Sequence, residues 1–463
     1  MRVRSAKPFR LLALAVAAAT LFAACGDGRD DDDSSSDTTA ASGTPTSAGE
    51  GGGGAATFDI DTADCETDPA SVTIEGDTIK LGTSLPQSGI YAAFAEILRG
   101  EQAYIQYLND DLGGVEVAGK TYKVELVAKD DGYNSDQTVA NVDSLIADDD
   151  VFALFNVVGT KNNLAIRDSV QTNCIPNLFA ATGSPAWGNP EYPWMLGTYL
   201  VPYPLEAQAL VNYLEDNNPT ASLAILRADD DFGRAYADTL KALIEGTDIT
   251  IKQEETYDPE GAEVAAQVTS LAASGADVFV LGATLLACPS ALNEMGKAGW
   301  KPSVVYMSGT CTSKTLMAAA GDNGAGVLSV SPLMDPNDPQ FASDEAMTLY
   351  KEKIAQYGNG ADATNGIVAY GWSAGAALQK SLEAASAPNR LAVMQAARTL
   401  DLSDVGLQLP GSEWVVGQDD WFLGEDFNLV QYDLAGKYFK PVGDLIKENG
   451  ETEKITPENL ING

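Results

Sequence analysis

From about residue 78 onward, apolar positions along the chain follow two alternating patterns. Short apolar runs such as Ile79–Thr83 predict strands, whereas Ser135–Ala147 has apolar residues at helical spacing. Strands that alternate with helices indicate a parallel sheet covered on both faces. We expect further strands at Lys123–Ala128, Val151–Val158, Ile175–Ala180, Ser222–Leu226, Asp277–Gly282 and Val304–Met307, and further helices at Tyr91–Asp111, Asn162–Val170, Phe232–Ile244, Ala262–Ala273, Phe341–Gln356 and Ala369–Ala384.

Two segments interrupt this alternation. Trp194–Pro204 is rich in proline and aromatic residues and is a poor helix, so we interpret it as a crossover, and a second crossover follows Val327–Pro332. The pattern predicts an α/β protein with two doubly wound parallel-sheet lobes joined by a hinge of several strands. The expected boundaries are lobe 1 at 58–200, lobe 2 at 201–330, a return to lobe 1 at 331–422, and a return to lobe 2 with the C-terminal tail at 423–463.

The N-terminal residues are typical of an export signal. A basic start precedes the apolar run Leu11–Ala24, which is too short to span a bilayer and suits a signal peptide at residues 1–24. The run ends in small residues before Cys25, as in a bacterial lipobox, although Phe22 stands where leucine is preferred. We expect Cys25 to be lipidated and residues 25–57 to form a flexible acidic and glycine-rich tether; plain secretion is the alternative.

Composition excludes several classes of function. The 463 residues include no histidine and carry a formal charge of −38. Histidine-dependent catalysis and histidine-ligated zinc are therefore excluded, and an acidic excess of this size disfavours nucleic acid as a partner. We expect no metal, no cofactor and no catalytic residue, and therefore no enzyme.

Past Cys25, four cysteines remain, an even number that suits an oxidising compartment. Cys288 and Cys311 both follow apolar, strand-like runs, so we pair them and assign Cys65 to Cys174. Four cysteines allow three pairings, and free buried thiols are the alternative to disulfides. A zinc site built from them is disfavoured because the sequence has no C-x-x-C pair.

Two sequence motifs match enzyme signatures in the wrong context. Gly114–Thr121 fits the P-loop pattern, but a predicted helix precedes it and a strand follows it, the reverse of a P-loop. We predict a helix-to-strand turn with hairpin character. Gly371–Gly375 fits the G-x-S-x-G nucleophile elbow, but the chain has no histidine for a triad. We place Ser373 within an apolar helix.

The order and spacing of several segments resemble one family. Ile79–Gly82, Leu85–Gly89, Gly113–Val115, Leu126–Asp131 and Ala276–Gly282, together with Asp231–Gly233 after a strand, are similar to segments of solute-binding proteins of the branched-chain amino-acid (Leu/Ile/Val-binding) type. The resemblance covers about 78–442. It implies two lobes of the type I periplasmic-binding-protein fold, a solute bound in the cleft, and delivery to an ABC permease.

The resemblance also implies a ligand site at the carboxyl ends of the strands, where helix N-termini present free amides. Val158, Gly159 and Thr160 resemble the loop that holds a ligand carboxylate, and Ala180 with Thr182 the segment that binds an amine. The alternative role of Thr160 and Thr182 is helix capping. For the aromatic residues Tyr91, Phe94 and Phe232, the alternative role is core packing. The remaining expected ligand contacts are Tyr91, Phe94, Phe232, Thr284 and Thr310.

One departure from the family concerns charge. Members that bind amino acids place an acid after the strand at Val304–Met307, where this chain has Ser308–Cys311 without a carboxylate. Either another acid, such as Asp230 or Asp231, pairs with the ligand ammonium, or the solute is not an amino acid. We favour a small carboxylate-bearing solute.

The predicted function is a monomeric, lipid-anchored, extracytoplasmic solute-binding subunit of an ABC importer, attached to the membrane only through its anchor. Its partners are the solute and the permease subunits. One alternative is a ligand-sensing receptor on the same fold. Another is a serine hydrolase at Ser373, which would show turnover where a binding protein shows only saturation.

Overall fold

The computed structural model describes residues 58–462, all of which belong to one compact unit. The expected signal peptide, Cys25 and the tether lie outside these residues. Within the described part of the chain, no helix combines the length and apolar character needed to cross a membrane.

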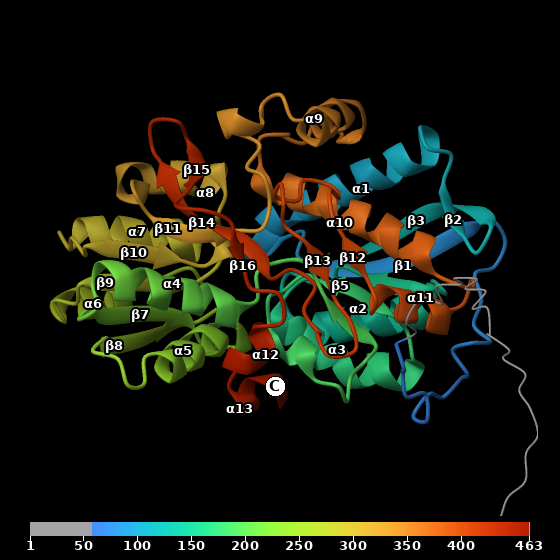
Figure 1. Cartoon of the computed structure of the whole chain (residues 1–463), viewed down its shortest axis with the longest axis horizontal. Helices are drawn as coiled ribbons and strands as arrows, with labels where there is room; N and C mark the ends of the chain where they lie inside the picture. The colour runs from blue at the N-terminus through green and yellow to red at the C-terminus, as the bar shows by residue number, and fades with distance from the viewer. Residues whose placement is uncertain (1–57, 463) are drawn as a thin grey trace, which may run out of the picture. The chain divides into compact units, whose positions relative to one another are not determined.

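Lobe 1 is built on a sheet with strand order β2-β3-β1-β4-β5-β6, parallel except for the edge strand β2. Helices α1 and α10 pack together on one face, and α2 and α3 on the other (Figure 1). The bounds are β1 Thr78–Leu85, β2 Val115–Val117, β3 Lys120–Asp130, β4 Ala153–Phe155, β5 Asn177–Ala180, β6 Met195–Gly197, α1 Ala95–Asp110, α2 Ser135–Ala147, α3 Thr160–Asn173, α9 Glu345–Tyr357, α10 Gly366–Ala384 and α11 Arg390–Ala397.

Lobe 2 is built on a sheet with strand order β15-β14-β11-β10-β9-β7-β8, in which β16 also pairs with β14. Strands β8, β7, β9, β10 and β11 are parallel, and β14 adds an antiparallel edge. The bounds are β7 Ser222–Ala228, β8 Thr250–Tyr257, β9 Val278–Gly282, β10 Val304–Met307, β11 Leu328–Ser331, β14 Asp426–Asp433, β15 Tyr438–Pro441, β16 Ile446–Lys447, α4 Tyr203–Asn217, α5 Asp231–Leu243, α6 Ala265–Ala273, α7 Ala287–Lys297, α8 Lys314–Ala320, α12 Thr452–Ile455 and α13 Glu458–Asn462.

The chain passes between the lobes at residues 198–202, 332–344 and 416–425. The second passage contacts the segment between β12 (Asp401–Leu402) and β13 (Trp414–Val415), which form a small sheet, through the hydrogen bond from Met334 N to Leu407 O. The predicted architecture of two doubly wound lobes joined by several segments is confirmed.

Element boundaries differ from the predictions at particular points. The helix expected from Tyr91 begins as the 3-10 helix η1, Gly89–Phe94, and α1 starts only at Ala95. The helix α4, Tyr203–Asn217, is not among the expected elements, and its first two residues lie within the expected crossover Trp194–Pro204. The structure places Pro204 in the first turn of α4, where a missing backbone N–H costs no hydrogen bond.

The P-loop-like segment is a hairpin, as predicted. Val117 of β2 pairs with Lys120 of β3, and the two residues between them, Ala118 and Gly119, both have positive φ, at 48° and 84°. Two-residue turns of this kind match the twist of antiparallel strands. No helix follows the turn, so these residues form no phosphate cradle.

The G-x-S-x-G segment lies within α10, also as predicted. A Cβ atom at Gly371 would lie 2.0 Å from the Ile97 carbonyl oxygen of α1, so this glycine permits close helix packing. The Ser373 hydroxyl is fully buried and accepts a hydrogen bond from Leu407 N at 3.0 Å. The motif therefore serves helix packing and presents no exposed nucleophile.

Two disulfides are formed with the pairing expected from the sequence. Cys65–Cys174 attaches the segment before β1 to the end of α3. Cys288–Cys311 joins the start of α7 to η3, the 3-10 helix Gly309–Cys311 that follows β10. The second bond therefore restrains the loop at the carboxyl end of a central strand.

Candidate functional site

The two threonines expected to bind the solute contact each other. Thr160 and Thr182 follow neighbouring strands of lobe 1, and their hydroxyl oxygens are 2.7 Å apart. Thr182 Oγ1 also accepts a hydrogen bond from Ser184 N at 3.1 Å. The Ala180 carbonyl, expected to meet a ligand amine, accepts hydrogen bonds from the backbone amides of Thr182 and Thr198. These groups are buried and paired with the protein itself.

Gly159 precedes α3 with a φ of 104°. A Cβ atom at this position would lie 2.7 Å from the Tyr133 ring, so the close approach of the loop to that ring requires glycine. The loop and the aromatic side chain are therefore packed as one unit at the carboxyl end of β4.

Aromatic side chains from both lobes meet beside these threonines. Tyr91 stacks on Tyr133 at 4.2 Å between ring centroids, and its hydroxyl donates a hydrogen bond to the Pro259 carbonyl of lobe 2 at 2.5 Å. Phe232 packs edge to face against Tyr203 at 5.0 Å. Tyr203, at the start of α4, was not predicted as a site residue. The lobes thus touch through tyrosine hydroxyls, that of Tyr91 on Pro259 and that of Tyr203 on Thr182.

A cavity with an empty volume of about 1050 Å³, part of it open to solvent, lies next to this contact and is bounded by both lobes. Of the ten expected ligand contacts, Phe94, Val158 and Thr310 line it. Tyr91, Gly159, Thr160, Ala180, Thr182, Phe232 and Thr284 lie outside its lining. Its wall is largely apolar and includes Phe94, Ile97, Val201, Val330, Met334 and Phe439.

Thr284 belongs to a different contact. Its backbone N–H donates a hydrogen bond to the Tyr257 hydroxyl at 3.4 Å, and Thr284 is only 5% exposed. The position after β9 therefore contributes to packing at the carboxyl edge of the lobe 2 sheet. Much of the cavity wall comes instead from the passage at 332–344.

The acids of the cavity are Glu206 and Asp335, neither of which the sequence indicated. Glu206, in the first turn of α4, is 2% exposed, and burial raises its pKa to about 8. Asp335 accepts hydrogen bonds from Phe439 N and from Asn337, and burial raises its pKa. Asp230, suggested as an ammonium partner, caps α5 through Gly233 N.

Asp231, the other suggested acid, forms an ion pair with Arg234 and is not part of the cavity lining. Its contacts are those of an acid in the first turn of a helix, where the helix dipole favours negative charge. Neither aspartate is thus placed to meet a solute in the cavity.

Lys314 is the cation of the cavity wall. Its ammonium donates hydrogen bonds to Asn337 Oδ1 at 3.3 Å and to Thr364 Oγ1 at 3.1 Å. Within residues 58–462 no carboxylate lies within 4.0 Å of it, so its charge has no direct ionic partner in that part of the protein.

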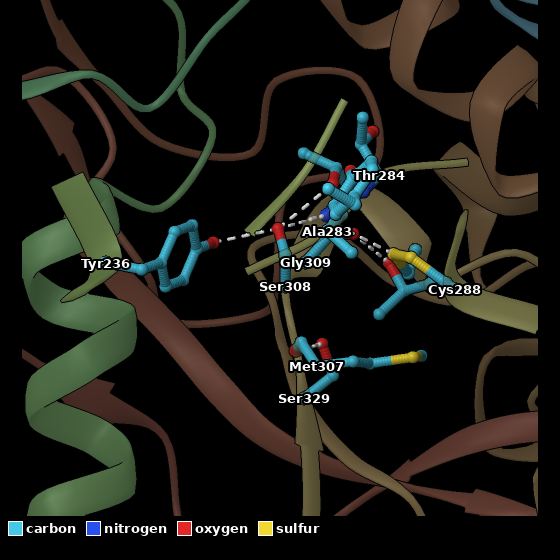
Figure 2. Close-up of a disulfide and its surroundings, with 12 residues drawn as sticks. Tyr236, Ala283, Thr284, Cys288, Met307, Ser308, Gly309 and Ser329 are labelled. Carbon is cyan, nitrogen blue, oxygen red and sulfur yellow. Dashed lines mark hydrogen bonds between the residues drawn. A yellow bond between two sulfur atoms is a disulfide. The ribbon is translucent and has the colours of Figure 1, made fainter. Parts of the chain in front are cut away.

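The loop after β10 is held from two sides. Figure 2 shows Tyr236 of α5 pointing toward Ser308, whose hydroxyl oxygen lies 2.8 Å from the Tyr236 hydroxyl, while the Cys288–Cys311 disulfide lies on the other side of the loop. Ser308 Oγ also accepts a hydrogen bond from Thr310 N at 3.2 Å. These contacts position Gly309 and Thr310 at the cavity wall.

Metal binding has no support in the described residues, among which no group of three or more Cys, Asp or Glu side chains is placed to hold an ion. The buried acids have hydrogen-bond donors from the backbone and from hydroxyl groups around them. The arrangement is suited to reversible binding of an organic solute.

Comparison with known proteins agrees with this geometry. A family model described as "Periplasmic binding protein" matches residues 78–437. A branched-chain amino-acid ABC transporter protein from Thermus thermophilus with bound valine has 17% identity and a TM-score of 0.71, covering 82% of this chain and 99% of its own. A fatty acid ABC transporter substrate-binding protein from Thermomonospora curvata has 18% identity and a TM-score of 0.70, covering 83% and 95%.

A substrate-binding periplasmic protein from Ralstonia solanacearum is 21% identical with a TM-score of 0.68, covering 78% of this chain and all of its own. At such identities these structures are evidence for the fold alone. The family match extends over most of the described residues, including the lobe 1 sheet and the lobe 2 strands from β7 to β14. The chain belongs to the periplasmic binding proteins, a family of extracytoplasmic solute-binding proteins and not a class of enzymes.

Proposed function

We propose that this protein is the lipid-anchored solute-binding subunit of an ABC importer and that it captures a carboxylate-bearing solute in the cavity between its lobes. The observation that carries the proposal is Lys314, a cation without an ionic partner within 4.0 Å among the described residues, in an otherwise largely apolar wall. A carboxylate would give this ammonium a charge-assisted hydrogen bond while the apolar wall covers the rest of the solute.

The names of two structural neighbours include ligands of this class. The Thermus thermophilus protein holds valine, and the Thermomonospora curvata protein is described as binding fatty acid. Both ligands are carboxylates with an apolar body, but only valine also carries an ammonium group. A carboxylate on an apolar body is thus the chemistry they share, and delivery to permease subunits follows from the importer role.

A thermal-shift screen over carboxylates, with and without an amino group, tests the proposal. A solute present at a hundredfold excess over its dissociation constant should stabilise the protein by about 2.7 kcal/mol. Lys314→Met should weaken binding at least about tenfold through loss of a charged hydrogen bond. The control Lys301→Met removes an exposed lysine of lobe 2 and should leave the affinity intact. Equal affinity in the Lys314 variant would contradict this role.

The lipid anchor is part of the same proposal and rests on the sequence. Residues 1–24 form the signal peptide, Cys25 carries the lipid, and residues 26–57 tether the lobes. Cys25→Ser should move the protein from the membrane fraction to the soluble fraction of an expressing bacterium. An unchanged membrane fraction would contradict anchoring, and a soluble wild-type protein would support plain secretion.

A further inference from the structure

Glu206 presents one carboxyl oxygen to the protein and leaves the other without a protein partner. Oε2 accepts hydrogen bonds from the Tyr236 hydroxyl at 2.5 Å and from Gly309 N at 2.9 Å. Oε1 receives no hydrogen bond from the described residues, and both Glu206 and Gly309 line the cavity. A Cβ atom at Gly309 would lie 3.1 Å from Oε1, so glycine leaves that oxygen uncovered.

The surroundings of Glu206 contain no positive group in contact with it. Tyr236 of α5, Tyr306 of β10 and Tyr203 of α4 are the titratable groups that face it, and burial raises the pKa of all three hydroxyls. The other charged groups of the cavity wall, Lys314 and Asp335, bond to Asn337 and not to Glu206. An ionised Glu206 would be a buried charge without a counterion.

Protonation removes that cost, and it has a defined position. Because Oε2 already accepts two hydrogen bonds, the proton of the neutral acid resides on Oε1. Burial raises the pKa of Glu206 to about 8, so the acid is mostly neutral at pH 7. The cavity wall then contains a hydroxyl donor that has no acceptor among residues 58–462.

We propose that Glu206 is a specificity-determining residue that donates a hydrogen bond from Oε1 to the bound solute, so that the site prefers a hydroxy or oxo carboxylate to the corresponding amino acid. This inference rests on the proposed function, since it assumes that a carboxylate occupies the same cavity. An alcohol or carbonyl oxygen accepts from the neutral acid, whereas an ammonium has no acceptor lone pair and favours an ionised Glu206.

Isothermal titration calorimetry on the processed protein tests the proposal with two ligands, 2-hydroxy-4-methylpentanoate and leucine. The two ligands have the same shape and differ only in the group beside the carboxylate. The hydroxy acid should bind more tightly than leucine at pH 6.5. Its affinity should fall about tenfold by pH 9, where roughly one-tenth of Glu206 remains protonated. 4-Methylpentanoate, which lacks both groups, should show a smaller fall.

Glu206→Gln keeps a donor and an acceptor but cannot ionise, so the tenfold dependence on pH should shrink below about twofold. Glu245→Gln, at an exposed acid of lobe 2, should keep the wild-type profile. The proposal would be overturned if leucine bound more tightly at pH 9 than at pH 6.5 and lost its binding in the Glu206→Gln variant. Glu206 would then be the partner of the ligand ammonium.

The two proposals fail in different ways. Carboxylates that bind with equal affinity at both pH values would overturn only the role of Glu206. If no carboxylate binds at either pH, the proposed function falls, and the role of Glu206 falls with it.

Discussion

At the scale of single residues, buried acids set how stability depends on pH. Glu101 of α1 is fully buried, accepts a hydrogen bond from Asn156 Nδ2 at 2.6 Å, and leaves Oε2 without a partner among the described residues. Burial raises its pKa to about 8, as it does for Glu206 and Glu425. A raised folded-state pKa means that these acids stabilise the fold at low pH and lose that contribution as pH rises toward and through 8.

We therefore expect the melting temperature of the wild type to fall between pH 5 and pH 9. The Glu101→Gln variant should reduce that fall by several degrees, because glutamine keeps the hydrogen-bond acceptor and cannot ionise. Scanning fluorimetry at half-unit pH steps measures both curves. The exposed Glu125→Gln should reproduce the wild-type curve. A Glu101→Gln curve parallel to the wild type would contradict this role, because it would show that folding does not shift the pKa of Glu101.

Individual site residues were only partly predictable. The resemblance to the family indicated Thr160 and Thr182 as ligand contacts; the structure brings them together, but they bond to each other. Glu206 carries no local signal, because its neighbours Tyr236 and Gly309 lie far away in sequence and meet it only through packing of α4, α5 and β10. Charge complementarity in a cavity depends on such long-range contacts.

At the scale of elements, glycine contacts bring α1 and α10 close together. A Cβ atom at Gly371 would lie 2.0 Å from Ile97 O, and one at Gly100 would lie 2.2 Å from Val368 O. Both obstacles are backbone atoms, which a rotamer change cannot move.

Gly371→Ala should therefore destabilise the protein by about 2–3 kcal/mol through forced separation of the two helices. Gly417→Ala is the matched control, since nothing lies within 4 Å of its added Cβ. Urea unfolding of both variants gives the free energies. A Gly371→Ala protein as stable as the control would mean that the helices separate without cost.

The disulfides allow a second comparison between elements. Replacing both cysteines by serine should cost about 3 kcal/mol for Cys288–Cys311 and about 5 kcal/mol for Cys65–Cys174, because the closed loops span 23 and 109 positions. Only the first replacement should weaken solute binding, because it frees η3 at the cavity wall. Guanidinium unfolding and calorimetry separate the two effects, and equal losses of affinity would contradict a local role.

Elements with a strong period were predictable, and those set by context were not. The bounds of α2 and β10 match the predictions at both ends, since each has a clear apolar pattern and a polar or glycine boundary. The expected strand Val151–Val158 shortens to β4 because only Ala153–Phe155 find ladder partners in β1 or β5. Pairing, which the sequence does not display, decides where a buried apolar run is a strand.

At the scale of the whole molecule, Tyr91 joins the two lobes through one hydrogen bond. Its hydroxyl, on η1 of lobe 1, donates to the Pro259 carbonyl of lobe 2. Tyr91→Phe should weaken solute affinity about fivefold, near the value of one neutral hydrogen bond. X-ray scattering with solute should give a larger radius of gyration for this variant. Tyr107→Phe, a control in α1, should change neither quantity.

The fold could be predicted from the sequence because strand and helix periods repeat along both lobes. The cavity could not be predicted in this way. Its wall combines η1, the loop after β10, α8 and the passage at 332–344, which come from distant parts of the chain. Leu333 and Met334 show the difficulty: they look like ordinary apolar linker residues until the lobes assemble around them.

The return of the chain to lobe 1 has a consequence for the order of folding. The last strand of that sheet, β6, ends at Gly197, but α10, which packs with α1 over one face, begins only at Gly366. A chain that emerges from its N-terminus therefore exposes the part of this apolar sheet face that α10 covers while lobe 2 is still being made. The first lobe cannot finish before the second, so the two mature as one cooperative unit, and a truncated chain ending after lobe 2 should aggregate.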